Sequence, residues 1–274
     1  MLRFTVLGSG STGNSTLIEA SDGHARRTRV LVDCGLTTRE LARRLAMRDV
    51  GLDHIDAVFV THEHSDHIGC LRTLVRKHRV TVWTSEGTWR GAGLPFDGPQ
   101  RSLFDTPRRR DIQPPPRFAR AGDVIRIGAL ELRCFAVPHD AAEPLQVVAS
   151  DGDRKLGIAT DLGTPDLMVM RHLQGVHALM LESNHDEDML AEGPYPFFLK
   201  RRIGGDFGHL GNAQAGELLR AVAHSGLEHV VAAHLSRHNN LPSLAAEGFA
   251  AVLDRRPSDI HVADPVAGTG WLRV

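Results

Sequence analysis

Residues 59–70 read FVTHEHSDHIGC and place three histidines and two acidic residues within positions 62–67. They directly follow residues 57–60, an apolar run that is typical of a short buried strand. Polar groups at the end of a rigid strand are well placed for binding or catalysis. The alternative is a solvated turn that happens to be rich in histidine. Four potential ligands in six residues favour metal chemistry over that alternative.

The spacing within this cluster does not fit a helical zinc site. Such a site needs histidines at i and i+4, and position 66 is Asp. In an extended segment, residues i and i+2 point the same way, so His62 and His64 can reach one ion together. Asp66 and His67 follow the strand end and must turn elsewhere. Two neighbouring ions would account for all four side chains, whereas adjacent Asp66 and His67 make a single tetrahedral site difficult to close.

Three more residues that can bind metal stand at the ends of later apolar runs. His139 ends the run RCFAVPH, Asp161 ends LGIATD and His234 ends VVAAH. Taken singly, each is more often a turn or capping residue than a ligand. Taken together with the cluster at 62–67, they would complete the shells of two ions.

Short apolar runs and helical periodicity predict a mixed α/β protein with sizeable sheets. A capping box, Thr37-x-x-Glu40, opens one predicted helix at 37–48. Further helices are predicted from Pro165 and over 212–224 and 244–253. Residues 91–117 are rich in Gly, Pro and Arg without a period, so we expect a loop insertion within a single domain, 1–274. The predicted strands are 3–8, 16–20, 29–35, 56–62, 80–84, 130–139, 145–150, 155–161, 177–183 and 229–236.

The composition excludes few classes of function and indicates no particular class of binding partner. The 274 residues carry a net charge of -1, so nothing global demands a polyanion or a membrane surface. Cys34, Cys70 and Cys134 form no CxxC pair, which argues against a disulfide framework and for a reducing compartment. From the pattern of residues 1–15 we expect no signal peptide, and no run is long enough to predict a membrane span. We therefore expect a cytoplasmic protein without a membrane partner, and these features predict no particular oligomeric state.

The motif THEHSDH, followed by His139, Asp161 and His234, resembles the metallo-beta-lactamase superfamily over residues 58–236. Other stretches resemble its YycJ/WalJ-like branch of metallohydrolases. The resemblance implies an α/β fold, the four-layer αββα metallo-beta-lactamase sandwich. It also implies that His62, His64 and His139 hold one ion, that Asp66, His67 and His234 hold another, and that Asp161 bridges them. The stretches that resemble the branch are SGSTGNS (9–15), PHDAAEP (138–144), ATDLG (159–163), LESNHDEDML (181–190), GPYPFFLKRRI (193–203), GHLGN (208–212) and HLSRHNN (234–240).

The branch implies a dinuclear metal-dependent phosphodiesterase, a nuclease acting on DNA. Two divalent ions, zinc in the first place with manganese or iron as alternatives, would share a water. They would lower its pKa toward ~7, and the resulting hydroxide would attack phosphorus. The alternative is a thioesterase or lactonase on the same scaffold, which the strand-like tail at 259–274 disfavours. A metal-bound module without activity is a third interpretation, against which the full ligand set argues.

Several residues are candidates for roles beyond ligation. Asp66 could accept a proton from the bridging water. His209 could contact phosphate or protonate the leaving group, although a structural histidine on a Gly-flanked turn explains it equally well. A nuclease also needs groups that grip phosphates, so a basic run at 200–202 is of interest. The Gly-rich stretch 9–15 lies between two predicted strands, which favours a tight hairpin whose loop reaches the site. The predicted substrate-binding residues are Asn184, His185, Asn212 and Arg201.

Overall fold

The computed structural model describes residues 1–21, 23, 26–94 and 114–274. Two seven-stranded sheets form its centre. The first sheet has the order β14-β1-β2-β3-β4-β5-β6 and the second the order β13-β12-β11-β10-β9-β8-β7. The strands of the first sheet are β1 (Leu2–Gly8), β2 (Ser15–Ser21), β3 (Arg27–Val32), β4 (Ala57–Phe59), β5 (Thr81–Thr84), β6 (Arg117–Phe118) and β14 (Leu272–Arg273). Those of the second are β7 (Val124–Ile127), β8 (Leu130–Ala136), β9 (Leu145–Ser150), β10 (Lys155–Ala159), β11 (Ala178–Glu182), β12 (His229–Ala233) and β13 (His261–Val262).

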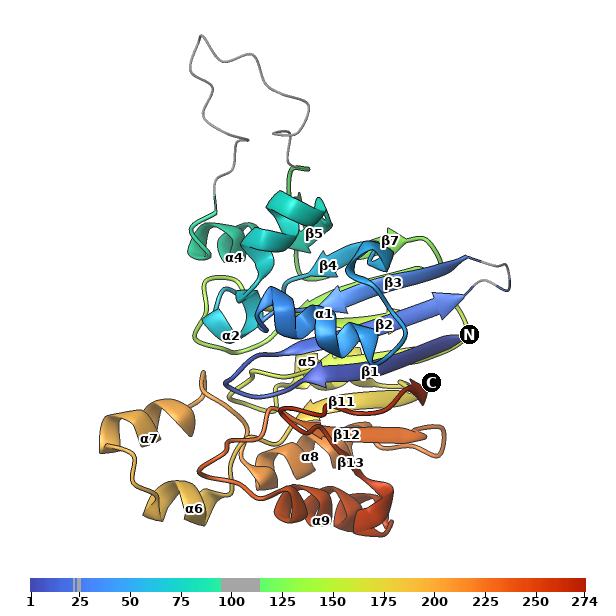
Figure 1. Cartoon of the computed structure of the whole chain (residues 1–274). Coiled ribbons are helices and arrows are strands. Elements are labelled where there is room, and N and C mark those ends of the chain that lie inside the picture. The colour runs from blue at the N-terminus through green and yellow to red at the C-terminus, as the bar shows by residue number, and fades with distance from the viewer. Residues whose placement is uncertain (22, 24–25, 95–113) are drawn as a thin grey trace, which may run out of the picture.

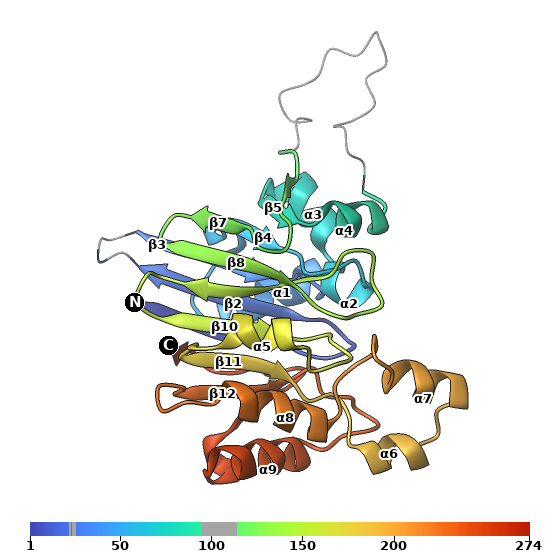
Figure 2. The same cartoon turned by 180° about the vertical axis from the view of Figure 1, so that it is seen from behind.

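Helices cover the outer face of each sheet (Figures 1 and 2). The helices that accompany the first sheet are α1 (Thr38–Ala46), η1 (Leu52–His54), α2 (Ser65–Ile68), α3 (Leu71–Thr73), η2 (Leu74–His78) and α4 (Glu86–Gly91). Those of the second half are α5 (Leu167–Leu173), α6 (Glu187–Glu192), α7 (Phe197–Ile203), α8 (Asn212–Val222), α9 (Pro242–Leu253) and η3 (Pro257–Asp259). Among the helices of the described residues, none combines the length and the hydropathy that a membrane crossing requires.

Three clusters of buried apolar side chains hold the layers together. The central cluster joins the facing surfaces of the two sheets through residues such as Phe59 and Leu132. A second cluster packs Leu41 of α1 under the first sheet, and a third packs Phe249 of α9 under the second. The predicted four-layer αββα sandwich is thus confirmed. The single domain over 1–274 stays a prediction.

Strand direction brings several strand ends to one edge of the sandwich. β3 and β4 are parallel, and so are β10, β11 and β12. β8 runs in the same direction as β10, because each pairs antiparallel with β9. Ligand sites of α/β sheets lie beyond the carboxyl ends of such strands. The residues that follow these strands are therefore placed to form a site at one edge of the sandwich.

The predicted elements agree with the structure except near their ends and in the short helices. Thr37 caps α1 through a hydrogen bond from Glu40 N, as the capping box predicts. The helix expected from Pro165 begins later, at Leu167, with Asp166 as its N-cap. Several short elements were not predicted, because two to seven residues give too little periodicity. They are the helices α2, α3, α4, α6, α7, η1, η2 and η3 and the strands β6 and β7. Most of the predicted insertion, 91–117, lies outside the described residues, which omit 95–113.

Gly248 offers a test of the packing of α9. It lies inside this helix, and a Cβ atom built on it would meet nothing within 4 Å. Gly248→Ala is therefore expected to stabilise the protein by about 0.5–1 kcal/mol, because alanine loses less backbone entropy in a helix. Urea unfolding of both proteins measures this change. A lower unfolding midpoint for the variant would contradict the arrangement of α9.

Candidate metal centre

Three histidines form the first group of side chains that can bind metal. His62 and His64 follow β4, and His139 follows β8. His64 Nδ1 lies 3.1 Å from His62 Nε2 and 3.3 Å from His139 Nε2. Ligands about 2.1 Å from a tetrahedral ion are roughly 3.4 Å apart. The three nitrogens therefore have the spacing of one face of a coordination shell.

A second group lies beside the first. His67 Nε2 lies 3.5 Å from Asp66 Oδ2 and 3.5 Å from Asp161 Oδ2. His234 Nε2 lies 3.6 Å from Asp66 Oδ2 and 3.4 Å from Asp161 Oδ1. Asp161 also belongs to a cluster with His62 and His67 whose ligand atoms all lie within 4.8 Å of one another. The two groups are thus contiguous, and Asp161 lies where they meet.

The donor atoms fit divalent metal ions. Asp161 Oδ2 and His234 Nε2 are buried, and neither has a hydrogen-bond partner within the described part of the chain. Buried polar atoms without partners are unfavourable, so both atoms call for a ligand. Imidazole nitrogens combined with carboxylate oxygens suit zinc, and also manganese or iron.

The outward-facing ring nitrogens of the first group are held by hydrogen bonds. His139 Nδ1 donates to Gly208 O over 3.0 Å, and His62 Nδ1 lies 3.0 Å from Thr61 Oγ1. A hydrogen bond at Nδ1 fixes the ring orientation and leaves Nε2 free to bind metal. His64 is the exception, because its Nδ1 is the atom that faces the other two rings.

Two buried carboxylates, one from each sheet, orient the second group. Asp33 follows β3, and its Oδ2 accepts a hydrogen bond from His67 Nδ1 over 2.8 Å. Glu182 is the last residue of β11. Its Oε1 accepts hydrogen bonds from His234 Nδ1 over 3.1 Å and from His209 Nδ1 over 2.8 Å. Both carboxylates therefore direct the Nε2 atoms of their histidines toward the centre.

These contacts also determine which groups carry protons. Burial opposes ionisation of Glu182, yet His209 and His234 lower its pKa to about 2. Burial likewise opposes ionisation of Asp161, and His234 and His67 hold its pKa well below the ordinary value. Burial disfavours a charge on His234, but Asp161 and the other carboxylates raise its pKa to about 10. A metal ion bound at His234 Nε2 would therefore have to displace a proton from this ring.

The backbone is left-handed at three residues of the centre. Asp33, Asp161 and His234 have φ angles of 63°, 56° and 55°. Each follows a strand of the parallel regions, namely β3, β10 or β12. This conformation is uncommon for residues other than glycine, and such strain concentrates at functional sites. At all three positions the chain turns sharply at the edge where the histidines gather.

The loop between β1 and β2 reaches the centre. These strands form an antiparallel hairpin, as the stretch SGSTGNS predicts. Asn14 Nδ2 lies 3.0 Å from Asp66 Oδ2, to which it donates, and 3.0 Å from His67 Nε2. Glu63 points the other way, and its Oε1 accepts a hydrogen bond from Ala142 N over 2.7 Å. It thereby ties the metal-binding segment to the loop that follows His139.

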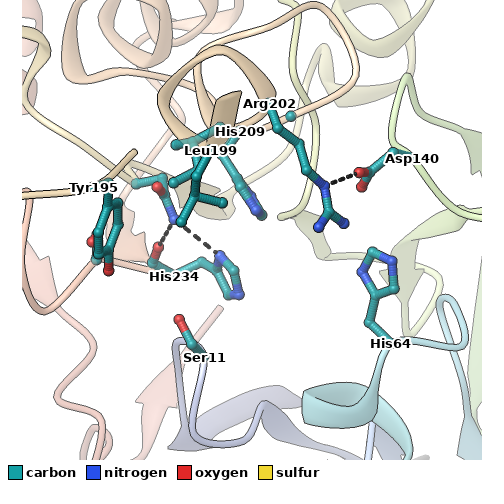
Figure 3. A pocket seen from close by; sticks show the side chains of 12 residues that line it. Ser11, His64, Asp140, Tyr195, Leu199, Arg202, His209 and His234 are labelled. Atoms are coloured by element: carbon teal, nitrogen blue, oxygen red, sulfur yellow. Dashed lines mark hydrogen bonds and ion pairs between the residues drawn. The ribbon is translucent and has the colours of Figure 1, made fainter. Parts of the chain in front are cut away.

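The centre opens into a cavity of about 240 Å³. Figure 3 shows His64, His209 and His234 around it, with Arg202 reaching in from α7. Arg202 Nε donates to Asp140 Oδ2 over 2.6 Å, and the other two guanidinium nitrogens point toward the cavity (Figure 3). A cationic group thus lies within the same cavity as the ligand groups.

The predicted substrate-binding residues occupy different positions. Asn184 lines the cavity, and its Nδ2 donates to His234 O over 2.8 Å. His185 is buried beside it, and its Nδ1 has no hydrogen-bond partner among the residues described. Asn212 accepts a hydrogen bond from Ser183 Oγ over 2.6 Å at the start of α8. Of the basic run at 200–202, the residue that lines the cavity is Arg202. The binding roles of Asn184, His185, Asn212 and Arg201 stay predictions.

Three residues with evident structural roles were missed from the sequence. Asp33 and Glu182 end the runs RVLVD and HALMLE, which is the pattern that singled out Asp161. A consistent search of every strand end would have found both. Asn14 lies in a Gly-rich loop, and the sequence has no signal for its contact with Asp66.

The model of the Beta-lactamase superfamily domain matches residues 28–235 of this chain. The chain belongs to the metallo-beta-lactamase superfamily. It is 34% identical over 275 residues to exodeoxyribonuclease YycJ of Bacillus anthracis, with 96% of each protein covered. It is 29% identical over 248 residues to exodeoxyribonuclease WalJ of Streptococcus pneumoniae, with 89% of this chain and 85% of that protein covered. The predicted resemblance to the YycJ/WalJ-like branch is confirmed, and the chain is a metal-dependent hydrolase.

Two solved structures share the fold of this chain. The metallo-beta-lactamase fold protein YhfI from Bacillus subtilis matches with a TM-score of 0.71 and 15% identity, over all of both chains. Zn²⁺-bound PqqB from Methylobacterium extorquens matches with a TM-score of 0.67 and 18% identity, over 99% of this chain and 100% of that one. At these identities the likeness concerns the arrangement of sheets and helices.

Gly35 tests how the metal-binding segment is packed. A Cβ atom on this residue would lie 1.6 Å from Asp66 O, so the backbone must move to accept it. Gly35→Ala is expected to displace Asp66 and His67 and to weaken metal binding by at least about tenfold, the scale of lost support around metal ligands. Metal titration of the purified variant measures the effect. Gly248→Ala is the matched control, and equal affinities in the two variants would contradict this packing.

Metal binding is expected to release protons. Burial disfavours charge on His67 and His234, but nearby carboxylates raise the pKa of His67 well above its usual value and that of His234 to about 10. Both rings are therefore in the charged form, protonated on both nitrogens, before metal binds at pH 7. The affinity for metal should then fall as pH falls, by about tenfold per pH unit for each proton displaced. Calorimetric titration in buffers of different ionisation enthalpy counts these protons. An affinity that stays constant from pH 6 to pH 8 would show that this linkage is absent.

Proposed function

We propose that this chain is a metal-dependent exonuclease that acts on DNA. Two contiguous groups of ligands at the mouth of a polar cavity support this proposal most directly, because two-ion sites serve in-line displacement at phosphorus. The relatives named exodeoxyribonucleases, which align with nearly the whole chain, support DNA as the substrate. One ion would bind His62, His64 and His139, the other Asp66, His67 and His234, with Asp161 as the bridging ligand.

The identity of the metals is proposed from the ligand atoms, which are histidine nitrogens and aspartate oxygens. Zinc is the first candidate, with manganese or iron as alternatives. When bound, two such ions supply Lewis-acid stabilisation of the phosphate charge and lower the pKa of water. The pKa of Asp66 is lowered despite its burial, mainly by His234 and His67. A carboxylate with a low pKa suits metal binding better than proton transfer. We therefore propose Asp66 as a metal ligand and not as the group that accepts a proton from water.

His209 is placed to act on the leaving group. The ionised carboxylate of Glu182 accepts a hydrogen bond from its Nδ1, so Nε2 is the nitrogen left for the cavity. A ring held in one orientation by a carboxylate can donate a proton to a departing oxygen without reorganisation. We therefore propose His209 as the catalytic acid.

Arg202 is placed to bind a phosphate next to the scissile bond. Asp140 holds its Nε, which leaves two guanidinium nitrogens for the oxygens of a ligand. Planar guanidinium groups bind phosphate by paired hydrogen bonds. Asn184, also at the cavity, could orient the same substrate through its side-chain amide.

Location and domain organisation are part of the proposal. Cys34, Cys70 and Cys134 are buried and unbridged, which supports a reducing compartment such as the cytoplasm. We also propose one domain over 1–274. Hydrolysis of a thioester or lactone is the alternative activity of the same centre. Residues 257–274 form the short elements η3, β13 and β14.

End-labelled DNA tests the proposed activity. Wild-type protein loaded with zinc or manganese should shorten DNA progressively from one end and should also cleave bis-p-nitrophenyl phosphate. His64→Ala removes one ligand and should lower kcat/KM for both substrates by at least about a hundredfold, because its loss weakens the metal or misplaces it. A time course with label at either end shows the direction of cleavage.

His78→Ala is the matched control, since His78 is an exposed histidine on η2. It should retain wild-type rates. Metal analysis should find about two ions per wild-type chain and fewer in the His64→Ala variant. Uncut DNA and uncut bis-p-nitrophenyl phosphate, together with rapid hydrolysis of a thioester or lactone, would overturn the nuclease assignment in favour of the alternative.

A further inference from the structure

Tyr195 lies at the cavity, and the proposed reaction gives it no role. It belongs to the segment between α6 and α7, and its half-buried side chain lines the cavity that also contains His209 and His234. Figure 3 shows Tyr195 and Arg202 on opposite sides of this cavity, with the two histidines between them. The aromatic ring is therefore placed beside the candidate metal centre and away from the cationic group.

The chain holds Tyr195 in a defined position. Pro194 precedes it and Pro196 follows it, and both prolines restrict the backbone. Leu199 N donates to Pro196 O over 2.9 Å, which joins the tyrosine directly to the start of α7. On the other side, Gly193 N donates over 2.8 Å to a carbonyl oxygen of α6. An aromatic ring on such a segment loses little conformational freedom when a ligand binds.

The ring of Tyr195 also contacts the segment that follows a candidate metal ligand. Its centre lies 5.9 Å from that of the His238 ring, and the two ring planes are inclined by 70°. This inclined contact orients the tyrosine, and because the ring also lines the cavity, part of it stays accessible to a ligand. His238 is four residues beyond His234, so the ring and the metal centre share one stretch of chain.

The cavity has a charged side and a neutral side. Arg202 and its carboxylate partner form the charged side. The opposite side carries Tyr195 together with the neutral groups of Asn184 and Ser236. Ser236 N donates to Asn184 O over 2.8 Å, and His238, two residues further on, contacts the tyrosine. A nucleotide has the same division, because its phosphate is charged whereas its sugar and base are neutral.

We propose that Tyr195 stacks on the base of the nucleotide at the scissile bond. The nucleoside then occupies the neutral side of the cavity, and a neighbouring phosphate binds Arg202 on the charged side. Every base has an aromatic face, so this contact favours nucleotides over simple phosphodiesters without reading the sequence. The inference rests on the proposed nuclease function and adds the residue that makes the centre specific for nucleotides.

Two p-nitrophenyl esters with the same leaving group test this contact on metal-loaded protein. Thymidine p-nitrophenyl phosphate carries one base, and methyl p-nitrophenyl phosphate carries none. Tyr195→Ala should raise KM for the thymidine ester roughly tenfold, the effect of losing one stacked base, with kcat little changed. KM for the methyl ester should change less than about twofold. The thymidine 5′ and 3′ esters are both measured, and the one that wild-type protein cleaves faster is used.

Two further variants show which part of the side chain matters. Tyr195→Phe keeps the aromatic face, so its KM for the thymidine ester should stay within about threefold of wild type. Phe198→Ala is the matched control, because it removes a nearby ring that is 73% exposed on α7 and does not line the cavity. It should give the wild-type KM for both esters.

Three results would overturn the contact with the base. An equal loss with both esters would mean that Tyr195 supports the centre structurally. A Tyr195→Phe variant as weak as Tyr195→Ala would mean that the hydroxyl group binds the substrate and the ring does not. An unchanged KM for the thymidine ester in Tyr195→Ala would mean that the base lies elsewhere.

Failure of the nuclease proposal would be seen separately. If metal-loaded wild-type protein leaves DNA and all these esters uncut, that proposal fails. Calorimetric titration with thymidine monophosphate and with methyl phosphate then decides the contact alone. Weaker binding of thymidine monophosphate only, in Tyr195→Ala, supports the stacked base. An equal loss for both ligands, or no loss for either, overturns it.

Discussion

The hydrogen bonds of Asp33 are the interactions on which the metal centre depends. Its Oδ1 accepts from Thr61 N over 2.8 Å, and its Oδ2 accepts from His67 Nδ1 over 2.8 Å. One carboxylate thus fixes both ends of the segment between Thr61 and His67, which contains four of the proposed ligands. Burial raises the pKa of Asp33, and the contacts with His67 and Thr61 oppose that rise. Removing His67 or Thr61 as a partner would therefore leave an unfavourable buried group as well as a loose loop.

In the second sheet, Glu182 plays the same part as Asp33, because it too accepts hydrogen bonds from the backbone and from histidine rings. It lies at the end of β11, where its Oε2 accepts from Leu162 N over 3.0 Å and from Leu210 N over 3.2 Å, while its Oε1 holds two histidines. Each half of the sandwich therefore contributes one carboxylate that binds backbone and ring together. A centre assembled from two sheets needs such anchors, because ligand atoms must be held to within a few tenths of an ångström.

The sequence singled out side chains that the structure brings together, because strand ends are local features. An apolar run followed by His or Asp identifies a residue at the edge of a sheet, and parallel strands bring such edges together. The resemblance to a family then supplied the pairing of the residues. The short helices were not predictable in this way, since a helix such as α7 buries no side chain and so has no apolar periodicity. Asn14 was missed for another reason, because its contact with Asp66 spans 52 positions and depends on the turn of a Gly-rich loop.

The absence of a buried face on α7 has a physical consequence for function. A helix of seven residues is too short to be stable alone, and α7 gains little from packing. Its position instead depends on the segment that follows it, which is hydrogen-bonded to His139 through Gly208 and to Glu182 through His209. A phosphate bound by Arg202 on α7 would therefore be coupled to the orientation of His139, a candidate metal ligand, and of the proposed catalytic acid. Binding energy from that contact can thus be used to order the groups that act at the scissile bond.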